Sequence, residues 1–328
     1  MDAMPPHIYP PYTTPGRERG VVAANPGTPY HQLARTRRHR WWRPPLGTLL
    51  LVTVWLAGMT FVMAAFATAA LVLGMDLFVG PTRFFANPVM NVAVLLGVIV
   101  VAGPAAWLAA WTVQRRPAGT LSSVIGRIRW RWLLSCFGVA IPLVILTLVA
   151  TYLMPPSGSA ADGSGSAGDW VGWERFLIAV AVLVALVPLQ STAEEYIFRG
   201  WIIQTVGAYV RIPWFGIGAG AVLFALAHGL GTTWGFVDLL LFSVVTGWLA
   251  VRTGGIEPGI ALHTTNNLLA FLLSAAFGSL GVIQTAAQAS WTLLAVDIVV
   301  LPLYAWLLTR LAERKEIPRT VPEPQQLA

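Results

Sequence analysis

The hydrophobic residues of this chain form long continuous runs and do not alternate with polar residues. Eight of these runs approach or exceed the roughly 20 residues of helix that cross a bilayer. The runs lie at about residues 46–73, 89–113, 132–153, 173–193, 213–229, 236–251, 259–277 and 291–309. Continuous apolar runs favour helices over a transmembrane β-barrel, whose strands alternate apolar and polar positions. The pattern therefore predicts an all-α polytopic membrane protein with about eight transmembrane helices.

Composition and charge agree with a membrane protein and predict its orientation. Charged residues make up 11% of the chain, against about 25% in a soluble domain. If both termini are cytoplasmic, 19 of the 21 basic residues lie inside and only Arg83 and Arg175 outside, as the positive-inside rule requires. The net charge of +7 then indicates contact with anionic lipid and not with nucleic acid. Arginine outnumbers lysine twenty to one, which favours a bacterial cell-membrane protein.

Polar segments divide the chain around this helical domain. Residues 1–44 are rich in proline and arginine, which predicts a disordered cytoplasmic tail. Residues 45–311 hold the transmembrane helices, with the chemically informative segments at about 173–277, and residues 312–328 form a second cytoplasmic tail. Glu257 is expected in a loop that faces the cytoplasm. No cleavable signal peptide is expected, because the first apolar run begins far from the start of the sequence.

Three apolar segments carry ionisable or amide side chains, which are costly in a membrane and are therefore functional candidates. Of the five histidines, only His228 and His263 lie in hydrophobic segments. The three motifs are Glu194-Glu195-x-x-x-Arg199, Phe224-x-x-x-His228 and His263-x-x-x-Asn267. Residues four apart share a helix face, so each motif predicts a pair of neighbouring side chains.

The spacing of the motifs predicts which side chains meet. Glu195 and Arg199 are expected to form an ion pair across one helical turn, while Glu194 points about 100° away. Pro213 is expected to separate two antiparallel helices, which brings Glu194 and His228 to a similar depth. The alternative is that both glutamates lie at the cytoplasmic end of a span and face water.

A glutamate, two histidines and an asparagine on three helices form a set that can hydrolyse an amide bond. A carboxylate beside an imidazole can remove a proton from water and later protonate the leaving amine. A second imidazole and an amide can donate hydrogen bonds to the oxyanion, an effect of about 3–4 kcal/mol per donor. A catalytic zinc site of Glu194, His228 and His263 is the competing arrangement, although the helical HExxH zinc motif is absent from the sequence.

Two functions without proteolysis would use the same buried cluster. A proton-coupled transporter would use Glu194 and His228 as a proton relay, and a non-catalytic membrane scaffold would bind a partner. The sequence has no internal repeat, which counts against many transporter folds. Proteolysis that depends on Glu194 would separate the enzyme from both alternatives.

The three motifs together resemble those of the CPBP family of intramembrane proteases, the CAAX protease and bacteriocin-processing (Abi) family. This family includes the type 2 CAAX prenyl endopeptidases, and its pattern is EExxxR, FxxxH and HxxxN or HxxxB on successive helices. In this chain the pattern reads EEYIFR at 194–199, FALAH at 224–228 and HTTNN at 263–267. All defining positions match, within the third of the chain at about residues 173–277.

The resemblance implies a role for each motif residue. Glu194 and His228 would activate water, and His263 and Asn267 would stabilise the oxyanion. The Glu195–Arg199 pair would support the site structurally. The implied substrate is a membrane-associated protein or peptide. The implied mechanism depends on glutamate and requires no metal, and a metalloprotease with zinc is the alternative.

Overall fold

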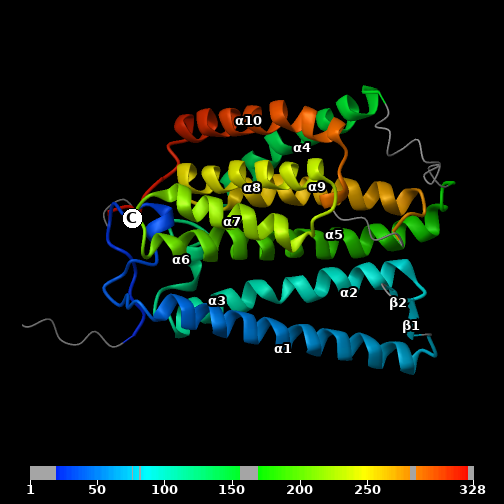
Figure 1. The fold of residues 1–328 in the computed structure, drawn as a ribbon, viewed down its shortest axis with the longest axis horizontal. Helices are drawn as coiled ribbons and strands as arrows, with labels where there is room; N and C mark the ends of the chain where they lie inside the picture. The colour runs from blue at the N-terminus through cyan, green and yellow to red at the C-terminus, as the bar shows by residue number, and fades with distance from the viewer. Residues whose placement is uncertain (1–19, 76, 81–82, 156–168, 281–285, 324–328) are drawn as a thin grey trace, which may run out of the picture.

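The structure is a computed structural model, and it describes residues 20–75, 77–80, 83–155, 169–280 and 286–323 of the chain. The described part is a bundle of helices with one short two-stranded hairpin (Figure 1). The α-helices are α1 (Arg43–Val72), α2 (Pro88–Val100), α3 (Ala102–Thr112), α4 (Trp130–Leu153), α5 (Trp173–Glu195), α6 (Ile203–Gly207), α7 (Pro213–Ala227), α8 (Thr233–Thr253), α9 (Glu257–Ala276) and α10 (Trp291–Arg314). The shorter elements are η1 (Tyr30–Gln32), β1 (Leu77–Gly80), β2 (Arg83–Phe85), η2 (Ala118–Leu121), the π-helical η3 (Tyr196–Ile202) and η4 (Ala286–Gln288).

Each predicted transmembrane run is helical, and the all-α class is therefore confirmed. The second run is divided at Val101 into α2 and α3, and α5 continues through η3 into α6. Within the described residues, six helical segments are long and apolar enough to cross a membrane, and α7 is a shorter apolar helix. With α9, these segments account for the predicted eight. The chain is a multi-pass helical membrane protein.

The helices lie roughly parallel in three groups (Figure 1). The first group holds α1, α2 and α3, the middle group holds α5, α7, α8 and α9, and the third holds α4 and α10. α9 contacts α4, α5 and α8, and its first eight residues, 257–264, are buried. α7 has only 15 residues, about 22 Å of helix. The turn after α7 therefore lies short of the end of the bundle that α5 and α9 reach (Figure 1).

The outer surface of the bundle is hydrophobic, as a surface in contact with lipid must be. Phe61 of α1 and Tyr152 of α4 are 75% and 86% exposed. Because lipid provides no hydrophobic drive for helices to associate, membrane helices pack through small residues that let backbones approach closely. α3 follows this rule, since Ala105, Ala106 and Ala109 are completely buried.

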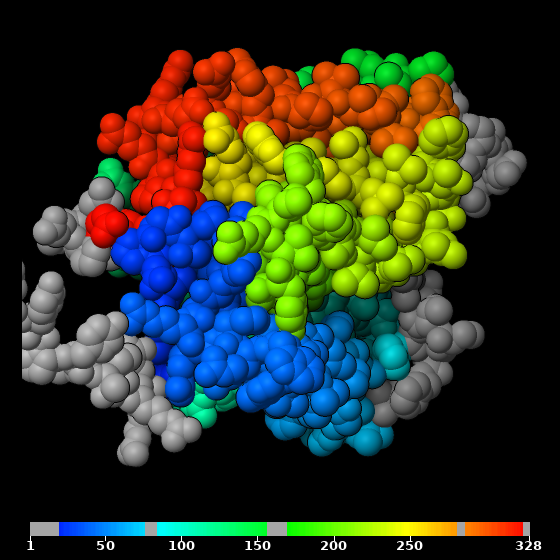
Figure 2. Space-filling model, turned by 60° about the vertical axis from the view of Figure 1, so that its left-hand side comes forward, coloured from blue at the N-terminus to red at the C-terminus, as the bar shows by residue number. Residues whose placement is uncertain are grey.

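Residues 20–42 pack against the basic end of the bundle, which corrects the prediction of a disordered tail over residues 1–44. Tyr30 is fully buried, and its hydroxyl donates a hydrogen bond to the Leu121 carbonyl at 2.5 Å. Pro29 forms a β-bridge with Thr320, and Figure 2 shows the N-terminal segment in dark blue against the C-terminal segment in red. Contacts with these distant residues offset the conformational entropy that the N-terminal segment loses when it becomes ordered. The composition of the segment gave no indication of such partners. Residues 1–19 of the predicted tail lie outside the described residues.

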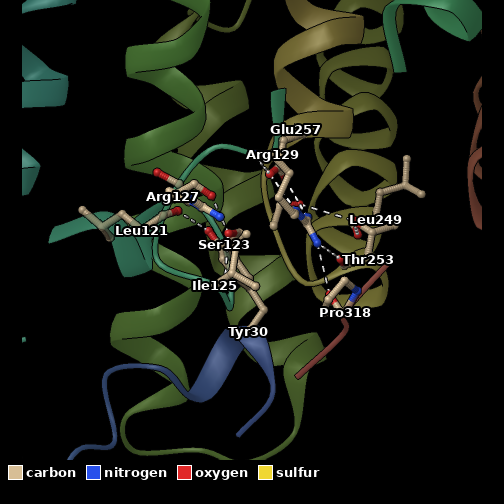
Figure 3. A network of polar contacts seen from close by, with 12 residues as sticks. Tyr30, Leu121, Ser123, Ile125, Arg127, Arg129, Leu249, Thr253, Glu257 and Pro318 are labelled. Atoms are coloured by element: carbon tan, nitrogen blue, oxygen red, sulfur yellow. Dashed lines mark hydrogen bonds and ion pairs between the residues drawn. The ribbon is translucent and has the colours of Figure 1, made fainter. Parts of the chain in front are cut away.

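The loop between α3 and α4 fixes the start of α9 (Figure 3). The Arg129 guanidinium donates to both carboxylate oxygens of Glu257 at 2.8 and 2.7 Å and to the carbonyls of Thr253 and Pro318. Glu257 is therefore fully buried as the first residue of α9, and the expectation that it lies in a cytoplasmic loop is wrong. Charges this deep are stable only with such partners. The contact holds in place the end of α9 that carries the third motif.

Candidate active site

The first motif lies where α5 passes into a π-helical segment. α5 ends at Glu195, and η3 begins at Tyr196. π-helical turns are rare and occur frequently at functional sites. Gly220 of α7 lets that helix approach closely, since a Cβ there would lie 2.8 Å from the Phe198 carbonyl oxygen. The backbone of the first motif is thus packed against the helix that carries the second.

Glu195 joins the first motif to the third. Its Oε1 lies 3.0 Å from Arg199 Nη1 and accepts a hydrogen bond from His263 Nδ1 at 3.0 Å. All three side chains are almost completely buried. The ion pair predicted from the four-residue spacing is confirmed. Glu195 also orients the His263 ring, because the nitrogen that faces a carboxylate must carry the hydrogen.

Aromatic rings and a hydroxyl complete the surroundings of Arg199. Its Nε donates to Thr246 Oγ1 at 3.0 Å. The guanidinium carbon lies 4.4 Å from the centre of the Phe224 ring and 5.5 Å from that of Phe242. A cation over an aromatic face is attracted by the ring quadrupole. Phe224, which opens the second motif, therefore packs directly on the charge of the first.

Glu194 belongs to an amide network that reaches Asn267. Its Oε1 accepts a hydrogen bond from Gln190 Nε2 at 2.7 Å, and Gln190 Oε1 accepts one from Asn267 Nδ2 at 3.3 Å. Its Oε2 lies 3.5 Å from His263 Nε2 and has no hydrogen-bond partner among the described residues. One oxygen of this buried carboxylate is thus held in place, and the other faces an imidazole.

His228 belongs to the aromatic cluster and not to this hydrogen-bond network. It caps the end of α7, and its Nδ1 donates to the Phe224 carbonyl at 2.9 Å. The Phe224 ring centre lies 4.5 Å from that of His228 and 5.7 Å from that of His263. In the described part of the chain, no hydrogen bond or ion pair joins His228 to Glu194, the residue that we expected it to meet. With its hydrogen on Nδ1, neutral His228 keeps a lone pair on Nε2.

Gly259 brings the backbone of α9 against the Glu195 carboxylate. A Cβ at this position would lie 2.1 Å from Glu195 Oε2, so no side chain fits here unless the carboxylate moves. Gly259 and His263 are one turn apart and share a helix face. The absence of a side chain at Gly259 therefore lets Glu195 reach His263.

Sequence reasoning missed two polar residues that contact the motif side chains, Gln190 and Thr246. The position of Gln190 could have indicated its role. A polar amide in an apolar helix is energetically costly, and Gln190 lies four residues before Glu194, on the same face of the helix. Thr246 gave no such signal. Its hydroxyl also donates to the Phe242 carbonyl of the preceding turn, an arrangement that any helical threonine can adopt.

The zinc alternative requires Glu194, His228 and His263 to converge. Among the residues that the structure describes, no group of three His, Cys, Asp or Glu side chains is arranged to hold a metal ion. His228 Nδ1 is bonded to the Phe224 carbonyl and His263 Nδ1 to Glu195, so a zinc ion would have to take the Nε2 atom of each ring. The described side chains therefore form no three-ligand group, and zinc is the alternative that a chelator tests.

Comparison with known proteins agrees with the motifs. Residues 173–269 match the family described as type II CAAX prenyl endopeptidase Rce1-like, which confirms the resemblance to CAAX-type proteases. The chain is also 27% identical over 189 residues to "Uncharacterized protein YyaK" of Bacillus subtilis (strain 168). That match covers 56% of this chain and 60% of the relative, so the chain spans less than two thirds of the curated relative. No solved structure matches.

Proposed function

We propose that the protein is an intramembrane endopeptidase of the CAAX-protease type that hydrolyses a peptide bond in a membrane-associated protein or peptide. The observation that carries the proposal is the buried carboxylate of Glu194, whose Oε2 lies 3.5 Å from His263 Nε2 and accepts no hydrogen bond from the described residues. A free acceptor beside an imidazole can bind and deprotonate a water molecule. The family match at residues 173–269 supports the same class of reaction.

Glu194 acts as the general base in this proposal. Gln190 holds Oε1, which leaves Oε2 to take a proton as the water oxygen attacks the carbonyl carbon of the substrate. His228 assists by accepting a hydrogen bond from the water at Nε2, because its Nδ1 is committed to the Phe224 carbonyl. When the carbon–nitrogen bond breaks, the proton passes from Glu194 to the leaving amine, and the carboxylate is regenerated.

His263 and Asn267 stabilise the oxyanion. Asn267 is oriented by Gln190 and keeps a second amide hydrogen to donate. When His263 carries a hydrogen on both Nε2 and Nδ1, its positive charge lies between the carboxylates of Glu194 and Glu195. The positive charges of His263 and Arg199 then balance the two negative charges. In that state Nε2 donates to the oxyanion, and such donors lower the barrier by about 3–4 kcal/mol each.

The basic end of the bundle faces the cytoplasm in this proposal, so that both termini of a bacterial cell-membrane protein lie inside. The described N-terminal and C-terminal segments pair with each other at that end. His263 is six residues from the start of α9, about 9 Å along the helix. Cleavage is therefore expected near the cytoplasmic leaflet.

Purified full-length protein in proteoliposomes, offered lipid-anchored and transmembrane peptides, tests the proposal. Glu194→Gln is expected to abolish cleavage and leave the melting temperature almost unchanged, because the amide keeps the size of the side chain but takes no proton. Glu174→Gln is the matched control, since Glu174 is exposed in the first turn of the same helix, and it is expected to cleave like wild type. Equal cleavage by Glu194→Gln and wild type would overturn the proposal.

A chelator distinguishes the glutamate mechanism from the zinc mechanism. Incubation of the purified protein with EDTA is expected to leave the rate of cleavage unchanged, because the described residues form no three-ligand metal group. The control is a known zinc protease in the same liposomes. Loss of cleavage that added zinc restores would contradict the metal-independent mechanism.

A further inference from the structure

We propose that a cavity beside the loop between α3 and α4 binds the head group of an anionic phospholipid. The cavity has a volume of about 800 Å³. Its walls come from residues 118–132, from Trp107 of α3, from Tyr196 of η3 and from Ile317 and Pro318 of the C-terminal segment. None of the residues proposed for hydrolysis lines it, so it is a separate site.

The cavity is lined by three arginines, and two of them have no compensating partner in the described part of the chain. Arg127 and Arg131 are both exposed, and their guanidinium groups make no hydrogen bond or ion pair within the described residues. The third arginine of the lining, Arg129, is committed to Glu257. No described carboxylate lines the cavity. Two free guanidinium groups at one rim are suited to phosphate, which accepts paired hydrogen bonds from arginine.

The loop that carries these arginines is held in place by hydrogen bonds and an ion pair (Figure 3). Ser123 Oγ donates to the Arg127 carbonyl at 2.6 Å, and the Tyr30 hydroxyl holds the Leu121 carbonyl. The Arg129–Glu257 ion pair holds the other end of the loop on α9. The arginines are therefore presented from a backbone that is already ordered before a ligand binds, which reduces the entropy lost on binding.

The other walls of the cavity are aromatic and apolar. Trp130 is 69% exposed and Trp107 is 43% exposed, and tryptophan is enriched at the level of lipid head groups. Trp132 is only 2% exposed, and its indole N–H has no hydrogen-bond partner among the described residues. A buried donor is normally satisfied, and an ester or phosphate oxygen of a ligand would supply the acceptor.

The position of the cavity selects a lipid over a soluble phosphate compound. α4 begins at Trp130 and is one of the helices able to cross a membrane, so the cavity lies where this helix enters the bilayer. Acidic lipids attract basic residues at the cytoplasmic surface. A phospholipid can lay its glycerol and upper acyl chains along Trp107 and Trp130 while its phosphate meets the arginines.

Native mass spectrometry of the full-length protein, freed of lipid in neutral detergent, measures this binding. Titration with phosphatidylglycerol is expected to saturate one tight site, and phosphatidylcholine is expected to bind that site more weakly. Arg127→Gln with Arg131→Gln should weaken phosphatidylglycerol binding by about fivefold for each arginine removed. Arg310→Gln with Arg314→Gln is the matched control, because it makes the same change of charge at exposed positions of α10 outside the cavity.

Two further measurements test the chemical identity of the ligand. Trp132→Phe keeps an aromatic ring and removes the N–H, so it should weaken phosphatidylglycerol binding without unfolding the protein. Glycerol phosphate at millimolar concentration should fail to displace the lipid. Equal loss of binding in the cavity variant and the control variant would overturn the site, and displacement by glycerol phosphate would overturn its assignment to a lipid. Lipid binding is read out without any cleavage, so this test is independent of the proposed hydrolysis.

Discussion

Replacing Gly259 by alanine is expected to disable the candidate active site without unfolding the protein. The new Cβ would lie 2.1 Å from Glu195 Oε2 and 2.9 Å from Glu195 Cδ. The carboxylate must withdraw by about 1.3 Å to reach an ordinary contact distance of 3.4 Å. Its two oxygens move together, so the contacts at 3.0 Å to Arg199 and to His263 cannot both be kept.

The effect on stability should be smaller than the effect on rate. Overpacking costs about 1–3 kcal/mol, but the neighbour is the end of a flexible side chain, and alanine is favoured over glycine in a helix by about 1 kcal/mol. We therefore expect the free energy of unfolding to fall by no more than about 2 kcal/mol. Loss of one hydrogen bond to a charged group costs about 1.5–3 kcal/mol. If that bond orients His263 in the transition state, kcat/KM should fall roughly 10- to 150-fold.

The assay measures kcat/KM for a cleaved peptide and the melting temperature of the same preparation. Gly138→Ala is the matched control, because a Cβ at Gly138 in α4 meets no atom within 4 Å. That variant should keep full activity and melt at the same temperature or slightly higher. Wild-type activity in Gly259→Ala would show that the position of the Glu195 carboxylate does not control the site. A fall in melting temperature large enough to explain the lost activity would also contradict the reasoning.

Three further changes test other contacts. Gln190→Met keeps the volume and removes the amide that orients the Glu194 carboxylate, so kcat should fall about tenfold. An unchanged kcat would argue against this role. Arg129→Met leaves the buried Glu257 without its partner and should lower the free energy of unfolding by about 3–5 kcal/mol. Arg252→Met removes an exposed ion pair and should lower it by less than about 1 kcal/mol. Equal shifts in melting temperature for the two variants would refute this difference. Burial lowers the pKa of His31, so its contribution to stability is present above about pH 6.5 and is lost as the pH falls below that value. The protection of the N-terminal segment from hydrogen exchange, relative to the intrinsic rate at each pH, should then fall on acidification in wild type and not in His31→Gln.

The fold class and the ion pair within the first motif could be predicted because both depend on local sequence. A continuous apolar run needs only its own length to specify a membrane helix. The Glu195–Arg199 ion pair follows from helical spacing alone, and it is present at 3.0 Å. The histidines stood out because an ionisable group in an apolar run is costly wherever the run packs.

Contacts that depend on how helices rotate and pack could not be predicted in this way. Counting residues from Pro213 predicted a depth for His228 and carried no information on the direction of its ring. The ring packs on Phe224 and has no bond to Glu194. The burial of Tyr30 depends on Leu121, 91 residues further along the chain. Glu257 looked like a loop residue because nothing near it in sequence indicates that Arg129 will neutralise it.

The central claim is that Glu194 activates water for peptide hydrolysis. Its most direct test compares the peptides in membranes of cells that express wild-type protein with those of cells that express Glu194→Gln at matched levels, with Glu174→Gln as the control. This role of Glu194 predicts fragments that appear with wild type and with Glu174→Gln and are missing with Glu194→Gln. The same fragments in all three membranes would contradict it.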